Sequence, residues 1–158
     1  MTKNEFKKVT KEWLISKGFK KTGDVWYSYS LTDFDITFGF PKDRFDEIYR
    51  IHVGFQLRDI ATGWGYETSS ISKRHKKYWI TYDIADGSKE LVKSNFYYEK
   101  WDKYDYLETL EEICDTHIKP YLDKGIKHLK EIVKKYGEPF EGNTYMIHPN
   151  AAEAVRNM

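Results

Sequence analysis

The stretch RIHVGFQLR, residues 50–58, alternates strictly between two kinds of side chain. One parity is apolar throughout: Ile51, Val53, Phe55 and Leu57. The other parity is polar apart from one glycine: Arg50, His52, Gly54, Gln56 and Arg58. Because successive side chains of a strand point to opposite faces, this pattern predicts a half-buried strand from about Ile48 to Arg58. It also predicts a sheet with one apolar and one polar face.

Other segments repeat this period of two. VWYSYSL (25–31) and FDITFGF (34–40) are joined by a short link, which predicts a hairpin. YWITYDI (78–84) keeps the same phase, and KELVKSNFYY (89–98) is a weaker strand candidate. Short connections of this kind favour an antiparallel sheet with one covered face.

A helix is expected at the N-terminus. TKNE, residues 2–5, has the pattern of a capping box, in which the side chains of Thr2 and Glu5 bond each other's backbone amides. Gly18 suits the position just past the end of a helix, where a left-handed backbone is common. We therefore expect a helix from about Lys3 to Lys17.

Helical periodicity returns from about Asp102 and stops at Gly137. Pro120 favours the start of a second helix, because proline is tolerated at the first helical position, and one kinked helix is the alternative. The segment 102–115 is rich in acids and 119–135 is rich in bases. One continuous helix would have its dipole complemented by this order, and a charged docking face is the other interpretation. The tail is expected to form a loop and then a short helix around 151–156.

These elements predict an α+β domain: an antiparallel sheet of about five strands with N-terminal and C-terminal helices packed on one face. The parts are a helix at 1–18, mainly strands at 19–100, helices at 101–137 and a tail at 138–158. A chain of 158 residues is the size of one domain and can bury roughly 70% of its unfolded surface.

Charge and composition exclude several classes. The formal net charge is +1, from 26 basic and 25 acidic residues, which argues against electrostatic capture of nucleic acid by the whole domain. The single cysteine, Cys114, excludes an internal disulfide and argues against a thiolate metal site. No apolar signal core or membrane-spanning stretch is present, so a cytoplasmic protein is expected. Aromatic residues make up 17% of the chain, and they suit a core that continues into a binding surface.

Apolar and turn positions between about Phe6 and Val133 carry a resemblance to a known family. They are Phe6, Leu14, Gly18-Phe19-Lys20-Lys21, Trp26-Tyr27, Val53-Gly54-Phe55 and Ile118-Lys119-Pro120-Tyr121-Leu122-Asp123. This order resembles domain of unknown function 4304, an uncharacterised bacterial family. The resemblance implies a single bacterial domain and no catalytic residue. The family's middle loop tends to hold a Cys-His-type stretch, whereas residues 59–79 here have no cysteine, so no role tied to such a stretch is implied.

The polar face of the sheet is the first candidate site. In-phase positions on the other strands add Ser28, Thr37, Thr81 and Asp83, and Gly39 and Gly54 leave room near the backbone. Tryptophan offers stacking and arginine a bidentate fork, so a planar or anionic ligand would fit. The alternative is a solvated face with cross-strand pairs. The candidate ligand-binding residues on this face are Trp26, Asp35, Arg50, His52, Gln56, Arg58 and Trp79.

His52 with Asp35 or Asp83 would make an acid–base pair, although a surface hydrogen bond is the commoner arrangement.

Three other segments are candidate surfaces. Trp64 lies between glycines in GWGYE and either contacts a ligand or anchors its loop. The basic run SISKRHKK (70–77) would hold a phosphate or RNA backbone, or is a charged loop. FYYEKWDKYDY (96–106) holds six aromatic residues, which form a binding platform or pack a strand end against a helix start.

Common catalytic and metal motifs are absent. The sequence has no HExxH, CxxC, calcium loop, GxGxxG, GxxxxGK[ST] or GxSxG, and we expect no metal or cofactor. The chain is therefore expected to be a binding or interaction domain rather than an enzyme. One version is an inhibitor or immunity-type protein with a protein partner. The rivals are a small-ligand binder or enzyme using the polar sheet face, and a weak RNA binder using the basic run.

Overall fold

The computed structural model describes residues 1–42, 49–57, 79–83, 95–136 and 149–158. Strands β1 (Lys20–Lys21), β2 (Trp26–Ser30), β3 (Phe34–Gly39), β5 (His52–Leu57) and β6 (Trp79–Asp83) form one sheet in the order β1-β2-β3-β5-β6. Every neighbouring pair in it is antiparallel. Strands β4 (Tyr49–Arg50) and β7 (Asn95–Phe96) pair separately. The expected α+β class and antiparallel sheet are confirmed.

The strand expected at 48–58 is interrupted. Ile51 belongs to neither β4 nor β5 and is fully buried, and the two strands on either side of it join different sheets. Alternation alone did not reveal this break, because the parity of the apolar side chains is kept through it: Tyr49, Ile51 and Val53 are all buried. The prediction of one strand was therefore wrong at this point.

The first helix, α1 (Lys3–Ser16), follows the expectation closely. Glu5 accepts a hydrogen bond from the Thr2 amide at 2.7 Å, and Thr2 Oγ1 accepts one from the Glu5 amide at 3.3 Å. This contact with the Thr2 amide lowers the pKa of Glu5. Gly18 has a φ of 86°, the left-handed conformation that a glycine just past a helix end supplies.

The C-terminal helical run is divided differently from the expectation. Helix α3 (Lys103–Ile113) continues through a π-helical turn, η2 (Cys114–Ile118), into α4 (Lys119–Lys124). Pro120 has no amide proton and its ring would clash with an ordinary α-helical turn before it, so the widened turn lets the chain pass without ending. Pro120 lies in the first turn of α4, as expected for the start of a second helix, although the π-helical turn keeps the run continuous; a further helix starts after Gly125, which has a φ of 53°.

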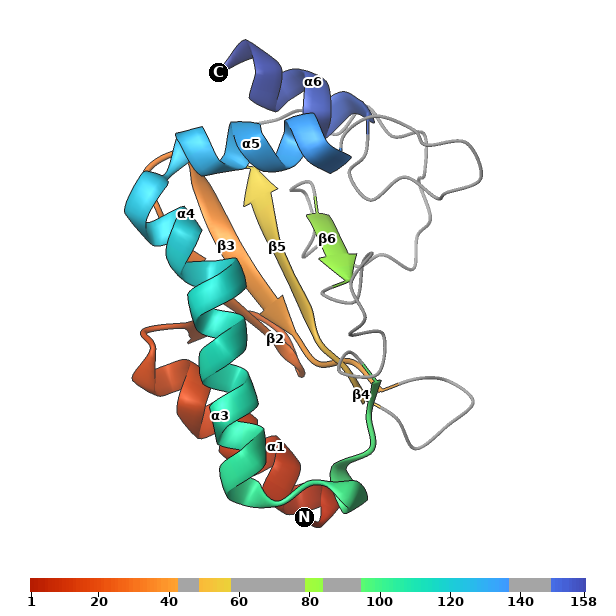
Figure 1. The fold of residues 1–158 in the computed structure, drawn as a ribbon. Helices are drawn as coiled ribbons and strands as arrows, with labels where there is room; N and C mark the ends of the chain where they lie inside the picture. The colour runs from red at the N-terminus through yellow and green to blue at the C-terminus, as the bar shows by residue number, and fades with distance from the viewer. Residues whose placement is uncertain (43–48, 58–78, 84–94, 137–148) are drawn as a thin grey trace.

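Helices α5 (Ile126–Tyr136) and α6 (Pro149–Asn157) complete the fold. In Figure 1 the run from α3 to α4 stands along the sheet, while α5 crosses the upper end of β3 and β5 with α6 above it. The basic segment 119–135 begins on α4, in line with α3, but continues on α5, which runs in a different direction, so the interpretation as one dipole-matched helix is wrong. The last helix was expected around 151–156, and α6 confirms it.

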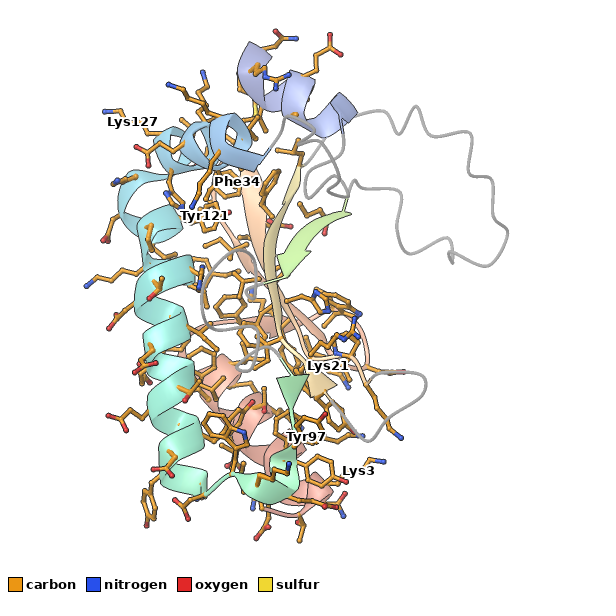
Figure 2. All side chains as sticks on the ribbon, turned by 45° about the vertical axis from the view of Figure 1, so that its right-hand side comes forward. Lys3, Lys21, Phe34, Tyr97, Tyr121 and Lys127 are labelled. Carbon is orange, nitrogen blue, oxygen red and sulfur yellow. The ribbon has the colours of Figure 1, made fainter. Side chains whose placement is uncertain are left out.

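The core lies between the helices and the apolar face of the sheet. Trp13 of α1 contacts Phe38 with ring centroids 5.7 Å apart, and Tyr121 of α4 meets Phe34 edge-on at 5.8 Å. Figure 2 shows the Tyr121 and Phe34 side chains facing each other between α4 and β3. The expectation that N-terminal and C-terminal helices cover the same face is confirmed.

Two polar contacts join α1 to α3. Thr10 Oγ1 bonds the Phe6 carbonyl at 2.8 Å and the Tyr106 hydroxyl at 2.7 Å, and both side chains are fully buried. At the more exposed end, Glu111 accepts from Lys17 Nζ at 2.6 Å and from Trp13 Nε1 at 2.8 Å. The Lys17 ammonium lowers the pKa of Glu111, although solvent screens this pair. Sequence reasoning missed both contacts, which depend on how two distant helices meet.

Candidate functional site: the polar face of the sheet

Strand register arranges the polar face into three rows across β2, β3, β5 and β6. The first row is Trp26, Gly39, His52 and Asp83. The middle row is Ser28, Thr37, Gly54 and Thr81, and Lys20 of β1 extends it at the outer edge. The third row is Ser30, Asp35, Gln56 and Trp79. Five of the predicted site residues thus lie on these rows, in the phase that the sequence indicated: Trp26, Asp35, His52, Gln56 and Trp79.

Trp26 lies across the sheet. A Cβ atom at position 39 would overlap its six-membered ring, so the indole covers the Gly39 backbone. The ring then approaches His52 on the far side of β3, with centroids 6.0 Å apart and a tilt of 36°. Only glycine permits this close approach, which is the role that a glycine inside a strand often has.

The centre of the polar face is closed to water. Along β3, Asp35 is 8% exposed and Thr37 is 0% exposed, whereas Trp26, Ser28, His52 and Gln56 are half-buried. The expectation of an uncovered or solvated face is therefore wrong at its centre. Alternation in the sequence reports the polarity of a face, and it carries no signal about what lies against that face.

The Thr37 hydroxyl is the most unusual group of this face. It is fully buried, and Oγ1 has no hydrogen-bond partner among the described residues. Its neighbours in the row are Ser28 and Gly54, and the glycine offers no side chain. A buried polar group left without a partner costs about 1–3 kcal/mol, and such a group in a folded protein calls for an explanation.

Register also decides between the two carboxylates considered for His52. Asp83 stands directly opposite His52, in the same row. Asp35 lies four residues along β3 from Gly39, the residue paired with His52, which corresponds to about 13 Å of strand. A direct His52–Asp35 acid–base pair is therefore wrong, and any such pair would use Asp83.

The remaining predicted residues stand apart from these rows or outside the described residues. Arg50 is in β4, where it pairs with Asn95, and its amide donates to the Pro41 carbonyl at 3.0 Å. The structure thus removes Arg50 from the five-stranded sheet. Arg58, Trp64 and the basic run 70–77 lie outside the described residues, and Trp79 is placed by its backbone pairing with Gln56 alone.

The aromatic segment 96–106 acts mainly in packing. Tyr98 and Tyr106 are 7% and 0% exposed, and both contact Phe6 of α1. Tyr97 and Tyr104 point outward at 45% and 79% exposure. Figure 2 shows Tyr97 at the surface near the start of the helical run. The interpretation that this segment packs a strand end against a helix start is confirmed for Tyr98 and Tyr106.

Metal-ligand clusters and membrane spans were also sought. Within the described ranges, no group of three or more His, Cys, Asp or Glu residues is arranged to hold a metal ion. Among the helices of those same ranges, none is both long enough and apolar enough to cross a membrane.

Comparisons with family models, with curated proteins and with solved structures found no match for this chain. The resemblance to domain of unknown function 4304 therefore stays a prediction. The site must be interpreted from its own geometry.

Proposed function

We propose that the protein is a binding domain and that its ligand site is the polar face of the five-stranded sheet. The observation that carries this proposal is the buried Thr37 hydroxyl, which no described group satisfies. It lies between a row with an indole and an imidazole and a row with a carboxylate and an amide. A ligand that bonds this hydroxyl would remove the desolvation penalty that the protein alone bears.

The groups on these rows favour a neutral ring-bearing ligand over an anion. Trp26 and His52 offer flat faces, Asp35 accepts hydrogen bonds, and Gln56 both donates and accepts. Arg50, one of the two arginines expected to bind an anion, belongs to the other sheet. The outer rows are about 13 Å apart, which suits a molecule of nucleoside size. We therefore propose a nucleoside-like ligand, with a flat heterocycle and several hydroxyl or amide donors.

Thermal unfolding in the presence of nucleosides tests this proposal. Adenosine, inosine, uridine and cytidine would each be added at 1 mM to the full chain. We expect at least one to raise Tm by several degrees, since ligand at ten times its Kd stabilises by about 1.4 kcal/mol and each kcal/mol shifts Tm by about 2–4 °C in a domain of this size. No shift with any of the four would overturn the proposal.

Two substitutions at position 37 provide the matched control. Thr37→Ser keeps the hydroxyl and should keep most of the shift, whereas Thr37→Val keeps the shape and should abolish it. An equal shift with both variants would place the ligand elsewhere. Trp26→Phe, which keeps a flat ring, should weaken binding less than Trp26→Ala.

The other functional expectations stay predictions. An inhibitor or immunity-type role would require a protein partner, and no described contact bears on one. The RNA-binding alternative depends on residues 70–77, which lie outside the described residues.

A further inference from the structure

Two helices of this molecule carry exposed faces of opposite charge. The acidic face is on α3, and its members are Asp105, Glu108 and Glu112. The lysine face is on α5, and its members are Lys127, Lys130 and Lys134. All six side chains are exposed, and Figure 2 shows Lys127 projecting outward from α5.

The two faces have the same spacing. Each places its charges at positions i, i+3 and i+7 of a helix, so the three charges lie along one side within two turns. A helix rises about 10 Å over seven residues. An acidic face laid along a lysine face can therefore match it charge for charge.

The two faces do not meet within one chain. The helical run from Glu108 to the end of α4 at Lys124 is about 24 Å long, and α5 then turns across the upper end of the sheet (Figure 1). Exposed charges at such a separation are largely screened, because the Debye length at physiological salt is only about 8 Å. Each face is therefore left to attract an oppositely charged surface from outside the chain.

Other charges on the same helices are already paired. Glu111 of α3 accepts from Lys17 Nζ at 2.6 Å, and Glu131 of α5 lies 3.4 Å from Lys124 Nζ. Among the described residues, by contrast, Asp105, Glu108 and the three lysines form no ion pair. Glu112 also interacts within its own chain, so the match depends most on the first two positions of each face.

An exposed tyrosine lies beside the acidic face. Tyr104 is 79% exposed, the largest value among the described large hydrophobic side chains, and it stands one turn before Glu108 on the same side of α3. Exposed ion pairs contribute little on their own. Tyrosine, in contrast, is among the residues that most often dominate the energy of an interface, and its ring attracts a lysine ammonium. The acidic face thus offers a partner a contact area as well as charge.

We propose that the acidic face of one copy of this chain docks on the lysine face of a second copy. Each chain carries both faces, so a dimer with twofold symmetry makes the same contact twice. The net charge of +1 opposes this association only weakly. The acid-rich segment 102–115 and the base-rich segment 119–135 then serve as a charged docking face, with each segment recognising the other across two molecules.

Sedimentation velocity of the full chain tests the proposal. At about 200 µM protein we expect a monomer–dimer equilibrium in about 50 mM salt, and association at least tenfold weaker in about 500 mM salt, because salt screens exposed charges. A monomer at both salt concentrations would overturn the proposal, as would a dimer of equal strength at both.

A charge swap identifies the two faces. The acid-reversed variant carries Asp105→Lys and Glu108→Lys. The lysine-reversed variant carries Lys127→Glu and Lys130→Glu. Each variant alone should be monomeric, because both contacts of its dimer bring like charges together. An equimolar mixture should form a heterodimer, since each reversed face meets its complement. A mixture that stays monomeric, or a variant that dimerises alone as the parent does, would overturn the proposal.

Matched controls separate these faces from net charge. Lys11→Glu with Lys20→Glu changes the net charge as much as the lysine-reversed variant does, at two exposed lysines of α1 and β1 outside both faces. This control should dimerise as the parent does, and a monomer would overturn the role of the faces. Circular dichroism checks that every variant is folded.

Alanine substitution tests the contact made by the tyrosine. Tyr104→Ala should weaken dimerisation at least fivefold, whereas Tyr97→Ala, at another exposed tyrosine outside both faces, should leave it unchanged. Equal losses in the two variants would overturn the placement of the contact at α3.

This proposal and the nucleoside site fail independently. Thr37→Val should dimerise as the parent does, and the lysine-reversed variant should keep the nucleoside-induced rise in Tm. A monomeric Thr37→Val would overturn docking through the two helix faces.

Discussion

Thr10 and Thr37 are the same residue type at the same burial, 0% exposed, in two layers of the molecule. Thr10 lies between α1 and α3, where Oγ1 contacts the Phe6 carbonyl and the Tyr106 hydroxyl. Because its one proton goes to the carbonyl, the tyrosine must donate the second bond. Thr37 lies on the polar face of the sheet, and Oγ1 has no described partner.

In one layer the buried threonine hydroxyl is hydrogen-bonded, whereas in the other it has no described partner and lowers the free energy of unfolding. Between the helices and the sheet, aromatic rings fill the space and the buried hydroxyl of Thr10 is satisfied at both ends. On the polar face, a buried hydroxyl is kept at the expense of stability. Natural proteins break local rules of this kind mainly at functional sites, which is why the comparison of the two threonines supports binding at the polar face.

A large effect is expected from alkaline pH acting on the helix-covered layer. Burial raises the pKa of Tyr106 far above its ordinary value of 10.0. The folded state therefore holds the phenol proton more tightly than the unfolded chain. Its contribution is complete below pH 10 and is lost above it, by about 1.4 kcal/mol per pH unit until the folded pKa is reached. Denaturant unfolding between pH 9 and pH 11.5 measures this slope.

Tyr106→Phe is the control for that slope. The variant lacks the titrating group, so its free energy of unfolding should fall less steeply above pH 10 than that of the parent chain. Tyr27, whose pKa burial also raises, remains in both proteins and cancels in the comparison. Identical slopes would mean that the Tyr106 hydroxyl is not buried in the folded protein.

Helix α1, the β2–β3 hairpin and the sheet phase were predictable because each depends on local signals. The capping box, Gly18 and the alternation from Trp26 to Leu57 are encoded within a few residues of where they act. The break at Ile51 was not predictable, since burial of Tyr49, Ile51 and Val53 continues through it. The π-helical turn before Pro120 was not predicted, because proline by itself indicates only that a new helix starts or that the helix kinks.

For the candidate site, sequence parity placed Trp26, Asp35, His52 and Gln56 on one face, but it left their order across the strands open. Pairing register supplied that order, and it separated His52 from Asp35. The burial of Thr37 depends on how distant segments meet, so it is not encoded in the spacing of residues along one segment.

Replacing Thr10 with valine should be the most damaging of the single substitutions compared here. It removes both hydrogen bonds of the Thr10 hydroxyl, including the one to the fully buried Tyr106 hydroxyl. We expect a loss of about 2–3 kcal/mol, since two buried hydrogen bonds of about 1–1.5 kcal/mol each are lost. Chemical denaturation measures it, and Thr109→Val, at a threonine of α3 that bonds only a backbone carbonyl, is the control. Equal losses in both variants would contradict the role given to the Thr10–Tyr106 contact.

Gly39→Ala tests how tightly the polar face is packed. The added methyl group would overlap the Trp26 ring and displace it from His52. Overpacking of this kind costs about 1–3 kcal/mol. In a Trp26→Ala background the same substitution should cost little, because the overlapping ring is gone. A double-mutant cycle by denaturation measures the difference, and additive losses would argue against the position of Trp26 over Gly39.

Thr37→Val should have the smallest effect on stability and the opposite sign to Thr10→Val. Valine has nearly the same shape as threonine and suits a strand, and it removes a hydroxyl that has lost water without gaining a described partner. We expect the free energy of unfolding to stay unchanged or rise by up to about 1 kcal/mol. Denaturation of Thr37→Val beside Thr37→Ser measures it, and the serine variant should show no gain because it keeps the hydroxyl. A clear loss of stability in the valine variant would mean that the hydroxyl is satisfied in the folded protein, and the contrast between the two threonines would then no longer support a ligand. A gain, together with loss of the nucleoside-induced shift, would show that stability has been given up at position 37 for binding.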